Sequence, residues 1–124
     1  MPSILIVEDD PDINELVSLR LQMNGHEVHA EFDGEAGLAA VKELKPDLVV
    51  LDWMMPRLTG VEVCRALRED PDVSATPVIL LTAKAQEADV QRGFAAGADD
   101  YVAKPFSPPE LASRVDALLA RAKA

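Results

Sequence analysis

The stretch Leu48-Val49-Val50-Leu51-Asp52 indicates the fold most directly. Its unbroken run of four apolar residues favours a strand that is buried on both faces, as the central strands of parallel sheets are. Asp52 ends that run. A carboxylate at the end of a buried strand needs a charged or hydrogen-bonding partner, because burial of an isolated charge is costly. Asp52 is therefore the first candidate for a functional residue.

Three other strand-like runs also end in polar or charged side chains. The runs and the residues that follow them are 4–7 with Glu8, Asp9 and Asp10, 78–81 with Thr82, and 100–103 with Lys104. In an open α/β sheet the carboxyl ends of the strands face one crevice, where ligands bind. We therefore expect carboxylates, a hydroxyl and an ammonium in one site, a set that suits a divalent cation and a phosphoryl group.

The apolar residues alternate five times between the strand pattern and the helix pattern. The expected strands are Ser3–Val7, Glu27–Glu31, Leu48–Leu51, Val78–Leu81 and Tyr101–Ala103. Helical stripes follow them at Ile13 to Leu21, Gly37 to Leu44, Val61–Glu69, Glu87–Ala96 and Leu111 to Leu119, the last after a capping box at Ser107-Pro108-Pro109-Glu110. Short connections predict an α/β fold, in which helices cover both faces of one doubly wound parallel sheet. The polar strand Glu27–Glu31 is expected at an edge.

Composition limits the classes of function. The chain has 124 residues, of which 48% are hydrophobic and 27% charged, so we expect one globular domain over residues 1–124. A formal net charge of −10 argues against direct nucleic-acid binding by this segment, because the phosphates would be repelled. No apolar run approaches the roughly 20 residues of a membrane span, and the first residues do not resemble a signal peptide.

Cys64 is the single cysteine of the sequence, so an intramolecular disulfide is excluded and a reducing cytoplasm is the expected location. Cys64 lies on the same helical face as Gly60, Val63 and Leu67. We interpret it as a buried thiol rather than a nucleophile, because the sequence places no partner for catalysis beside it.

The acidic residues predict a Mg²⁺ site. Asp9 and Asp52 would repel each other without a cation between them, and Mg²⁺ prefers oxygen ligands while keeping several waters. Asp9 and Asp52 are expected to bind directly, together with a backbone carbonyl just beyond Asp52, and Glu8 to hold a metal-bound water. A structural interpretation stands beside this one: Asp10 or Asp12 can cap the first helix.

Asp52 can act as a nucleophile toward a phosphoryl group and so form an acyl phosphate. The charge of the transferred group would be stabilised by the cation, the ammonium of Lys104 and the hydroxyl of Thr82. Taken alone, Lys104 is also consistent with an exposed lysine in a loop.

The motifs ILIVEDD, LVVLDWMMPRLTG, VILLTAK and GADDYVAKPF, together with the closing helix, resemble the receiver domain of bacterial response regulators in order and spacing. The resemblance covers essentially the whole chain. It implies a flavodoxin-like sheet with strand order 2-1-3-4-5. It also implies that Asp52 is the phosphoacceptor, that Glu8 and Asp9 serve Mg²⁺, that the carbonyl of Met54 binds the metal and that Lys104 contacts the phosphoryl group.

The same resemblance implies a switch driven by phosphorylation. Thr82 matches the switch hydroxyl and Tyr101 the switch aromatic. Apart from the resemblance, Tyr101 can also be interpreted as a half-buried edge residue with its hydroxyl in water. Met54 and Lys84 match the two positions that control hydrolysis of the acyl phosphate. The implied donor is a histidine kinase or a phosphotransfer protein, and the implied catalysis is limited to self-phosphorylation and autodephosphorylation.

The resemblance extends to receivers attached to DNA-binding domains, which dimerise through charge pairs. Asp100 and Arg114 match one such pair, and Glu110 is present. Val90 and Asp116 replace the usual basic residues, so two of three pairs are broken. A homodimer, an output domain and a stand-alone receiver all remain open at this point.

Two other classes of function are alternatives to a receiver. An aspartate-nucleophile phosphatase of the haloacid-dehalogenase type has similar chemistry, but it usually carries a second aspartate two residues after the nucleophile, where this sequence has Met54. A metal-free interaction module leaves the carboxylates of the site unexplained.

Overall fold

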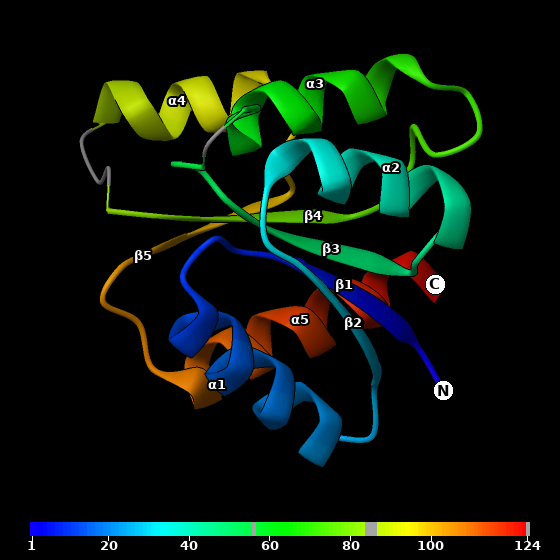
Figure 1. The fold of residues 1–124 in the computed structure, drawn as a ribbon, viewed down its shortest axis with the longest axis vertical. Helices are drawn as coiled ribbons and strands as arrows, with labels where there is room; N and C mark the ends of the chain where they lie inside the picture. Colours follow the sequence, from blue (N-terminus) through cyan, green and yellow to red (C-terminus); the bar gives the residue numbers. More distant parts are fainter. Residues whose placement is uncertain (56, 84–86, 124) are drawn as a thin grey trace.

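In a computed structural model, which describes residues 1–55, 57–83 and 87–123, strands and helices alternate along the chain (Figure 1). The strands are β1 (Ser3–Val7), β2 (Glu27–Glu31), β3 (Leu48–Asp52), β4 (Val78–Thr82) and β5 (Asp100–Ala103). The helices are α1 (Pro11–Met23), α2 (Gly34–Leu44), α3 (Gly60–Glu69), α4 (Glu87–Ala95) and α5 (Pro108–Lys123).

The five strands form one parallel sheet in the order β2-β1-β3-β4-β5, which confirms the predicted flavodoxin-like order. Helices α2, α3 and α4 cover one face and α1 and α5 the other (Figure 1). Strand β2 lies at an edge as predicted, and all five of its residues are at least partly exposed. All residues of β3 and β4 are buried, because these strands have neighbours on both sides and helices on both faces.

Alternation along the central strands divides the apolar side chains between two cores. Leu5, Val49 and Leu51 belong to the core beneath α2 and α3, whereas Ile6 and Val50 belong to the core beneath α1 and α5. Both cores continue to the strand ends. The backbone around Asp52 is therefore held by packing on both sides of the sheet.

Strands β3 and β4 each end one residue later than predicted. Asp52 pairs in register with Leu81, and Thr82 pairs with Ala103. Two predicted functional side chains are thus the last residues of buried strands. The sheet, rather than a loop, sets the direction of both.

Helix ends agree with the sequence patterns in part. Asp10 caps α1 by accepting from the backbone N–H groups of Asp12 and Ile13. The capping box predicted for α5 is incomplete: Ser107 Oγ accepts from the Glu110 backbone, but the Glu110 carboxylate lies 3.8 Å from Arg114 instead.

Smaller differences concern single residues. Leu44, expected on the buried stripe of α2, is 42% exposed, because it lies in the last turn and the chain leaves the helix in a left-handed conformation at Lys45. Helix α3 begins at Gly60 rather than Val61, and α4 ends at Ala95 rather than Ala96.

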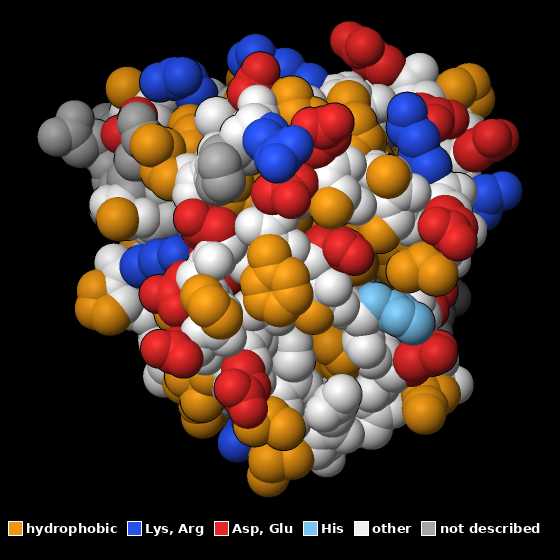
Figure 2. Space-filling model, in the orientation of Figure 1, with side chains coloured by type: hydrophobic (Ala, Val, Ile, Leu, Met, Phe, Trp, Pro, Cys, Tyr) orange, Lys and Arg blue, Asp and Glu red, His pale blue; other side chains and the backbone are white. Residues whose placement is uncertain are grey.

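The predicted burial of Cys64 is confirmed, and this burial raises the pKa of its thiol to about 11. Figure 2 shows acidic side chains spread over the viewed face, with basic ones between them. In the part of the chain that the structure describes, every helix is too short or too polar to cross a membrane.

Candidate functional site

The carboxyl ends of β1, β3 and β5 bring Glu8, Asp9, Asp52 and Lys104 together, and Thr82 ends β4 at the same edge of the sheet. Glu8 directly follows β1, and its N–H extends the ladder to the carbonyl of Glu31 on β2. The Lys104 N–H does the same at the other side, where it donates to the carbonyl of Thr82 at 2.7 Å. Residues far apart in sequence therefore meet at one edge of the sheet, as expected from parallel topology.

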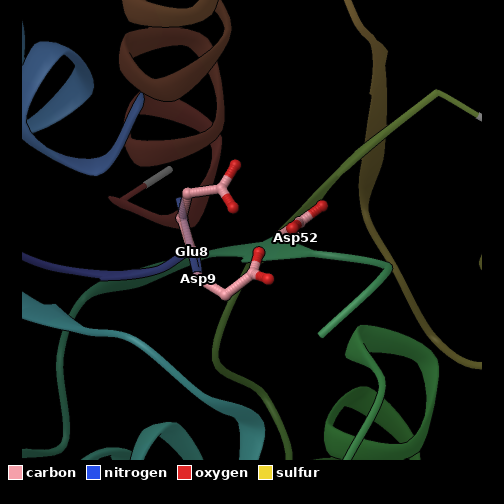
Figure 3. Close-up of side chains that lie close together, drawn as sticks. All are labelled: Glu8, Asp9 and Asp52. Carbon is pink, nitrogen blue, oxygen red and sulfur yellow. The ribbon is translucent and has the colours of Figure 1, made fainter. Parts of the chain in front are cut away.

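Three carboxylates form the centre of the site. Glu8, Asp9 and Asp52 each offer an oxygen, and these oxygens lie within 4.8 Å of one another (Figure 3). Glu8 and Asp52 are buried, whereas Asp9 is exposed. The side chains of Glu8 and Asp9 leave adjacent positions in different directions, and that of Asp9 points toward Asp52 (Figure 3).

Lys104 is an internal partner of this cluster and not a lysine extended into solvent. Its Nζ donates to Glu8 Oε1 at 2.7 Å and to Asp52 Oδ1 at 3.3 Å, and its side chain is 22% exposed. Burial opposes the charge, but the hydrogen bond to Glu8 and the charges of Asp52 and Glu8 together raise the pKa of Lys104. Lys104 thus stays protonated and ties the end of β5 to β1 and β3.

The cluster carries more negative charge than Lys104 neutralises. Burial, followed by the hydrogen bond and the charge of Glu8, raises the pKa of Asp52 to about 8 against the opposing effect of Lys104. A divalent cation would reverse this penalty, because it favours the ionised carboxylates. An all-oxygen donor set fits Mg²⁺.

The hydrogen bonds of the site separate the roles of the carboxylates. Glu8 Oε1 accepts from Lys104, and Glu8 Oε2 accepts from the backbone N–H of Asp10 at 3.2 Å. Both oxygens of Glu8 therefore have protein donors. That Asp9 and Asp52 contact a cation directly while Glu8 holds a metal-bound water stays a prediction, with which these bonds of Glu8 are compatible.

Thr82 is buried beside Tyr101, whose hydroxyl is also buried. Burial raises the pKa of Tyr101, and the neighbouring Thr82 hydroxyl opposes this shift. The Tyr101 ring lies edge-on to Trp53 at 6.3 Å between centroids, and 6.5 Å from the ring of Phe94. Tyr101 is therefore turned inward in this structure, unlike the edge residue with its hydroxyl in water.

Of the two positions expected to control hydrolysis of the acyl phosphate, the structure describes Met54. The side chain of Met54 is 57% exposed, two residues after Asp52. Lys84 lies outside the described residues.

The charge pairs considered for a dimer form within the chain. Arg114 Nη1 donates to both carboxylate oxygens of Asp100, at 3.0 and 3.1 Å, and Glu110 lies on its other side. Asp116 Oδ1 lies at a hydrogen-bond distance of 2.9 Å from His26 Nε2.

Two residues near the site were not assigned a role from the sequence. Gly60 lies so close to the backbone of Asp52 that a Cβ atom would overlap the Asp52 carbonyl, and its N–H donates to the Trp53 carbonyl at 2.9 Å. The glycine directly after the helix cap Thr59 was the available signal. Asn14 is a buried polar residue on α1, and its position in an otherwise apolar stripe was the signal there.

The order of the strands and the acidic cluster at their carboxyl ends define a flavodoxin-like α/β domain with a candidate cation and phosphoryl site. The family model of the response regulator receiver domain matches residues 4–116, and the chain belongs to this family. Receiver domains of two-component response regulators are signalling switches. This assignment disfavours the small-molecule phosphatase considered above.

Named relatives agree with the family. The chain is 46% identical over 123 residues to the phosphate regulon transcriptional regulatory protein PhoB of Rhizobium meliloti, covering 99% of this chain and 54% of that protein. It is 48% identical over 121 residues to the DNA-binding dual master transcriptional regulator RpaA of Synechocystis, covering 98% and 50%. The chain thus spans about half the length of these relatives.

A solved structure of the Francisella response regulator 1452 receiver domain is also similar. It superimposes with a TM-score of 0.93 at 35% identity and covers 98% of this chain and 99% of that one.

Proposed function

We propose that this chain is a phosphorylation-activated switch of a two-component system, with Asp52 as the phosphoacceptor. The observation that carries the proposal is the bridge from Lys104 Nζ to Asp52 and Glu8, beside three carboxylates whose oxygens lie within 4.8 Å of one another. The proposed donor is the phosphohistidine of a histidine kinase or a phosphotransfer protein.

In the proposed reaction a carboxylate oxygen of Asp52 attacks the phosphorus atom. The new P–O bond forms as the P–N bond to the donor histidine breaks, and the released imidazole takes up a proton. Asp52 has to be ionised for this step. Lys104 favours the ionised form of Asp52 and is placed to contact the oxygens of the incoming group.

Asp9, Asp52 and the Met54 carbonyl would hold Mg²⁺, with Glu8 holding a metal-bound water. When bound, Mg²⁺ would neutralise charge on the carboxylates and on the phosphoryl oxygens. Glu8 meanwhile anchors Lys104, so that the ammonium stays beside Asp52 when the cluster changes its charge.

The response to phosphorylation would pass through Thr82 and Tyr101. The Thr82 hydroxyl would move toward the acyl phosphate and vacate space into which Tyr101 can turn. The buried Tyr101 hydroxyl of this structure corresponds to the inward position that this step would favour. This would bias an equilibrium of the face formed by α4, β5 and α5. A phosphorylation-dependent homodimer through that face would require Arg114 to exchange its bonds with Asp100 inside the chain for bonds across the interface.

The partners follow from the same proposal. A kinase or phosphotransfer protein acts on Asp52, and an output domain or a downstream protein reads the altered face. The transcriptional names of the two relatives favour a transcriptional output for the switch, while the net charge of −10 argues against DNA contact by this segment. The single thiol and a kinase donor are consistent with a cytoplasmic location.

Labelling with a small phosphodonor tests the proposal. Acetyl phosphate with Mg²⁺ should add one phosphoryl group, seen by intact-protein mass spectrometry, and EDTA should prevent it. Asp52→Asn should abolish the label. The matched control is Asp10→Asn, because the Asp10 side chain follows the cluster in sequence and caps α1, a role that asparagine can keep. Undiminished labelling of Asp52→Asn would refute the assignment.

A further inference from the structure

Asn14 makes three hydrogen bonds from a buried position on α1. Its side chain is 1% exposed and lies on the same inward stripe as Val17 and Leu21. Its Nδ2 donates to the carbonyl of Glu8 at 3.1 Å and to the carbonyl of Glu31 at 3.0 Å, while its Oδ1 accepts from Ser18 Oγ at 3.2 Å. The amide thus links α1 to the ends of β1 and β2.

The orientation of this amide is determined by its neighbours. Each Nδ2 hydrogen meets a backbone carbonyl, and Oδ1 meets a hydroxyl donor from one turn further along the helix. A flipped amide would place Oδ1 against the two carbonyl oxygens of Glu8 and Glu31 and lose both donated bonds. Asn14 therefore has one favourable arrangement, and Ser18 supports it.

The Glu8 carbonyl belongs to the peptide group that joins Glu8 to Asp9. The N–H of Glu8, in the preceding peptide, donates to the carbonyl of Glu31, and the carbonyl of the Glu8–Asp9 peptide itself accepts from Asn14 Nδ2. The two acidic side chains leave the backbone on either side of this peptide, Glu8 toward Lys104 and Asp9 toward Asp52. A rotation of this peptide would change both directions at once.

We propose that Asn14 is a positioning residue for the acidic cluster, which acts by fixing the Glu8–Asp9 peptide. The inference rests on the proposed function, because it assigns Asn14 to the support of the same Mg²⁺ site. Residues that orient metal ligands without touching the metal typically change metal affinity by about 10–100-fold when they are lost. Asn14 acts through backbone atoms, so we expect the lower end of that range.

The decisive variant is Asn14→Leu, which keeps the size of the side chain and removes both donors. It should weaken Mg²⁺ binding about 10-fold, measured by titration of Trp53 fluorescence on protein that circular dichroism shows to be folded. Hydrogen exchange in EDTA supplies a readout without metal. The Asp10 amide, which donates to Glu8 Oε2, should exchange faster in Asn14→Leu than in the wild type.

The matched control is Val17→Ala, which removes buried volume one turn further along the same helix, from the apolar core rather than from the acidic cluster. It should lower the thermal stability and leave both the Mg²⁺ affinity and the Asp10 exchange unchanged. Ser18→Ala provides a second, milder test, because it removes the support of the amide and leaves both Nδ2 bonds available. It should weaken Mg²⁺ binding about 2–3-fold. If Asn14→Leu does not fold, the Mg²⁺ affinity of Ser18→Ala tests the proposal in its place.

Wild-type Mg²⁺ affinity in folded Asn14→Leu would overturn the proposal, as would an equal loss of affinity in Val17→Ala. Failure of the proposed function has a different signature. In that case the wild-type protein takes no phosphoryl group from acetyl phosphate, whereas the exchange of the Asp10 amide still reports whether Asn14 holds the Glu8–Asp9 peptide.

Discussion

Replacing Asp52 by asparagine should stabilise the metal-free protein while it abolishes phosphorylation. Asp52 is 3% exposed and shares its surroundings with Glu8 and Asp9, whose oxygens lie within 4.8 Å of it and of one another. Burial and Glu8 raise its pKa from 3.8 to about 8 in the absence of a cation. Ionised Asp52 therefore costs free energy in the folded state, and Asp52→Asn removes this cost.

The sign of the pH dependence follows from the raised pKa. The folded protein binds the Asp52 proton more tightly than the unfolded chain does. The contribution of this proton to the free energy of unfolding is therefore complete below the unfolded pKa of 3.8 and is lost as the pH rises to about 8. At neutral pH the ceiling is about 4 kcal/mol, from roughly three pKa units at about 1.4 kcal/mol each. Lys104 loses its charged partner in the variant, which offsets part of the gain.

We therefore expect Asp52→Asn to raise the free energy of unfolding by about 1–2 kcal/mol near pH 8 in EDTA, or by about 3–10 °C in Tm for a chain of this size. Near pH 5 the difference should be much smaller, because the wild-type carboxyl is then largely protonated. Thermal unfolding followed by circular dichroism at both pH values measures this.

Added Mg²⁺ should reverse the order of stability. The wild type gains stability by binding the ion in its folded state, whereas Asp52→Asn has lost a ligand and gains little. If Asp52→Asn is no more stable than the wild type near pH 8 in EDTA, the assigned repulsion within the cluster is wrong. If Mg²⁺ raises the Tm of both proteins equally, the cation binds elsewhere.

Three further predictions concern neighbouring residues. The phosphoryl group should last for minutes or longer, because Met54 offers no hydrogen bond to an attacking water; Met54→Asn should shorten this lifetime, and decay of the wild-type phosphoprotein within seconds would contradict the reasoning. Arg68→Met should lower the free energy of unfolding in urea by about 2–4 kcal/mol, because Arg68 donates to the carbonyls of Ser74, Thr76 and Gly97 and pairs with Asp99 at 2.8 Å; a loss below about 0.5 kcal/mol would contradict it. Gly60→Ala should slow labelling by acetyl phosphate, because its Cβ would displace the Asp52 carbonyl; an unchanged rate would show that the start of α3 adjusts without moving Asp52.

Local patterns were sufficient to predict the parallel sheet, its covering helices and the place of the site. Strand and helix periods act over a few residues, and Leu48–Leu51 or Val78–Leu81 show them without reference to the rest of the chain. Once the strands are parallel, their carboxyl ends must share one edge. Asp52, Thr82 and Lys104 could therefore be placed in one site from their positions after apolar runs.

The partners of individual side chains depended on contacts between distant segments. The sequence pattern was consistent with Lys104 either in an exposed loop or in the site. Its bonds to Glu8 and Asp52 follow from the position of β5, two strands away from β3 in the folded sheet. The Glu110 carboxylate turned to Arg114 rather than to the backbone of its own helix end, because a cationic partner lay within reach. Such competition between partners is absent from a one-dimensional pattern.

Asn14 shows the same distinction most clearly. In the sequence it interrupts an apolar stripe, and nothing local indicates what a buried amide there would meet. The carbonyls of Glu8 and Glu31 become its partners because β1 and β2 end side by side beneath α1. A periodic sequence specifies which face of an element is buried, whereas hydrogen bonds require angstrom-scale distances that exist once separate elements have packed together.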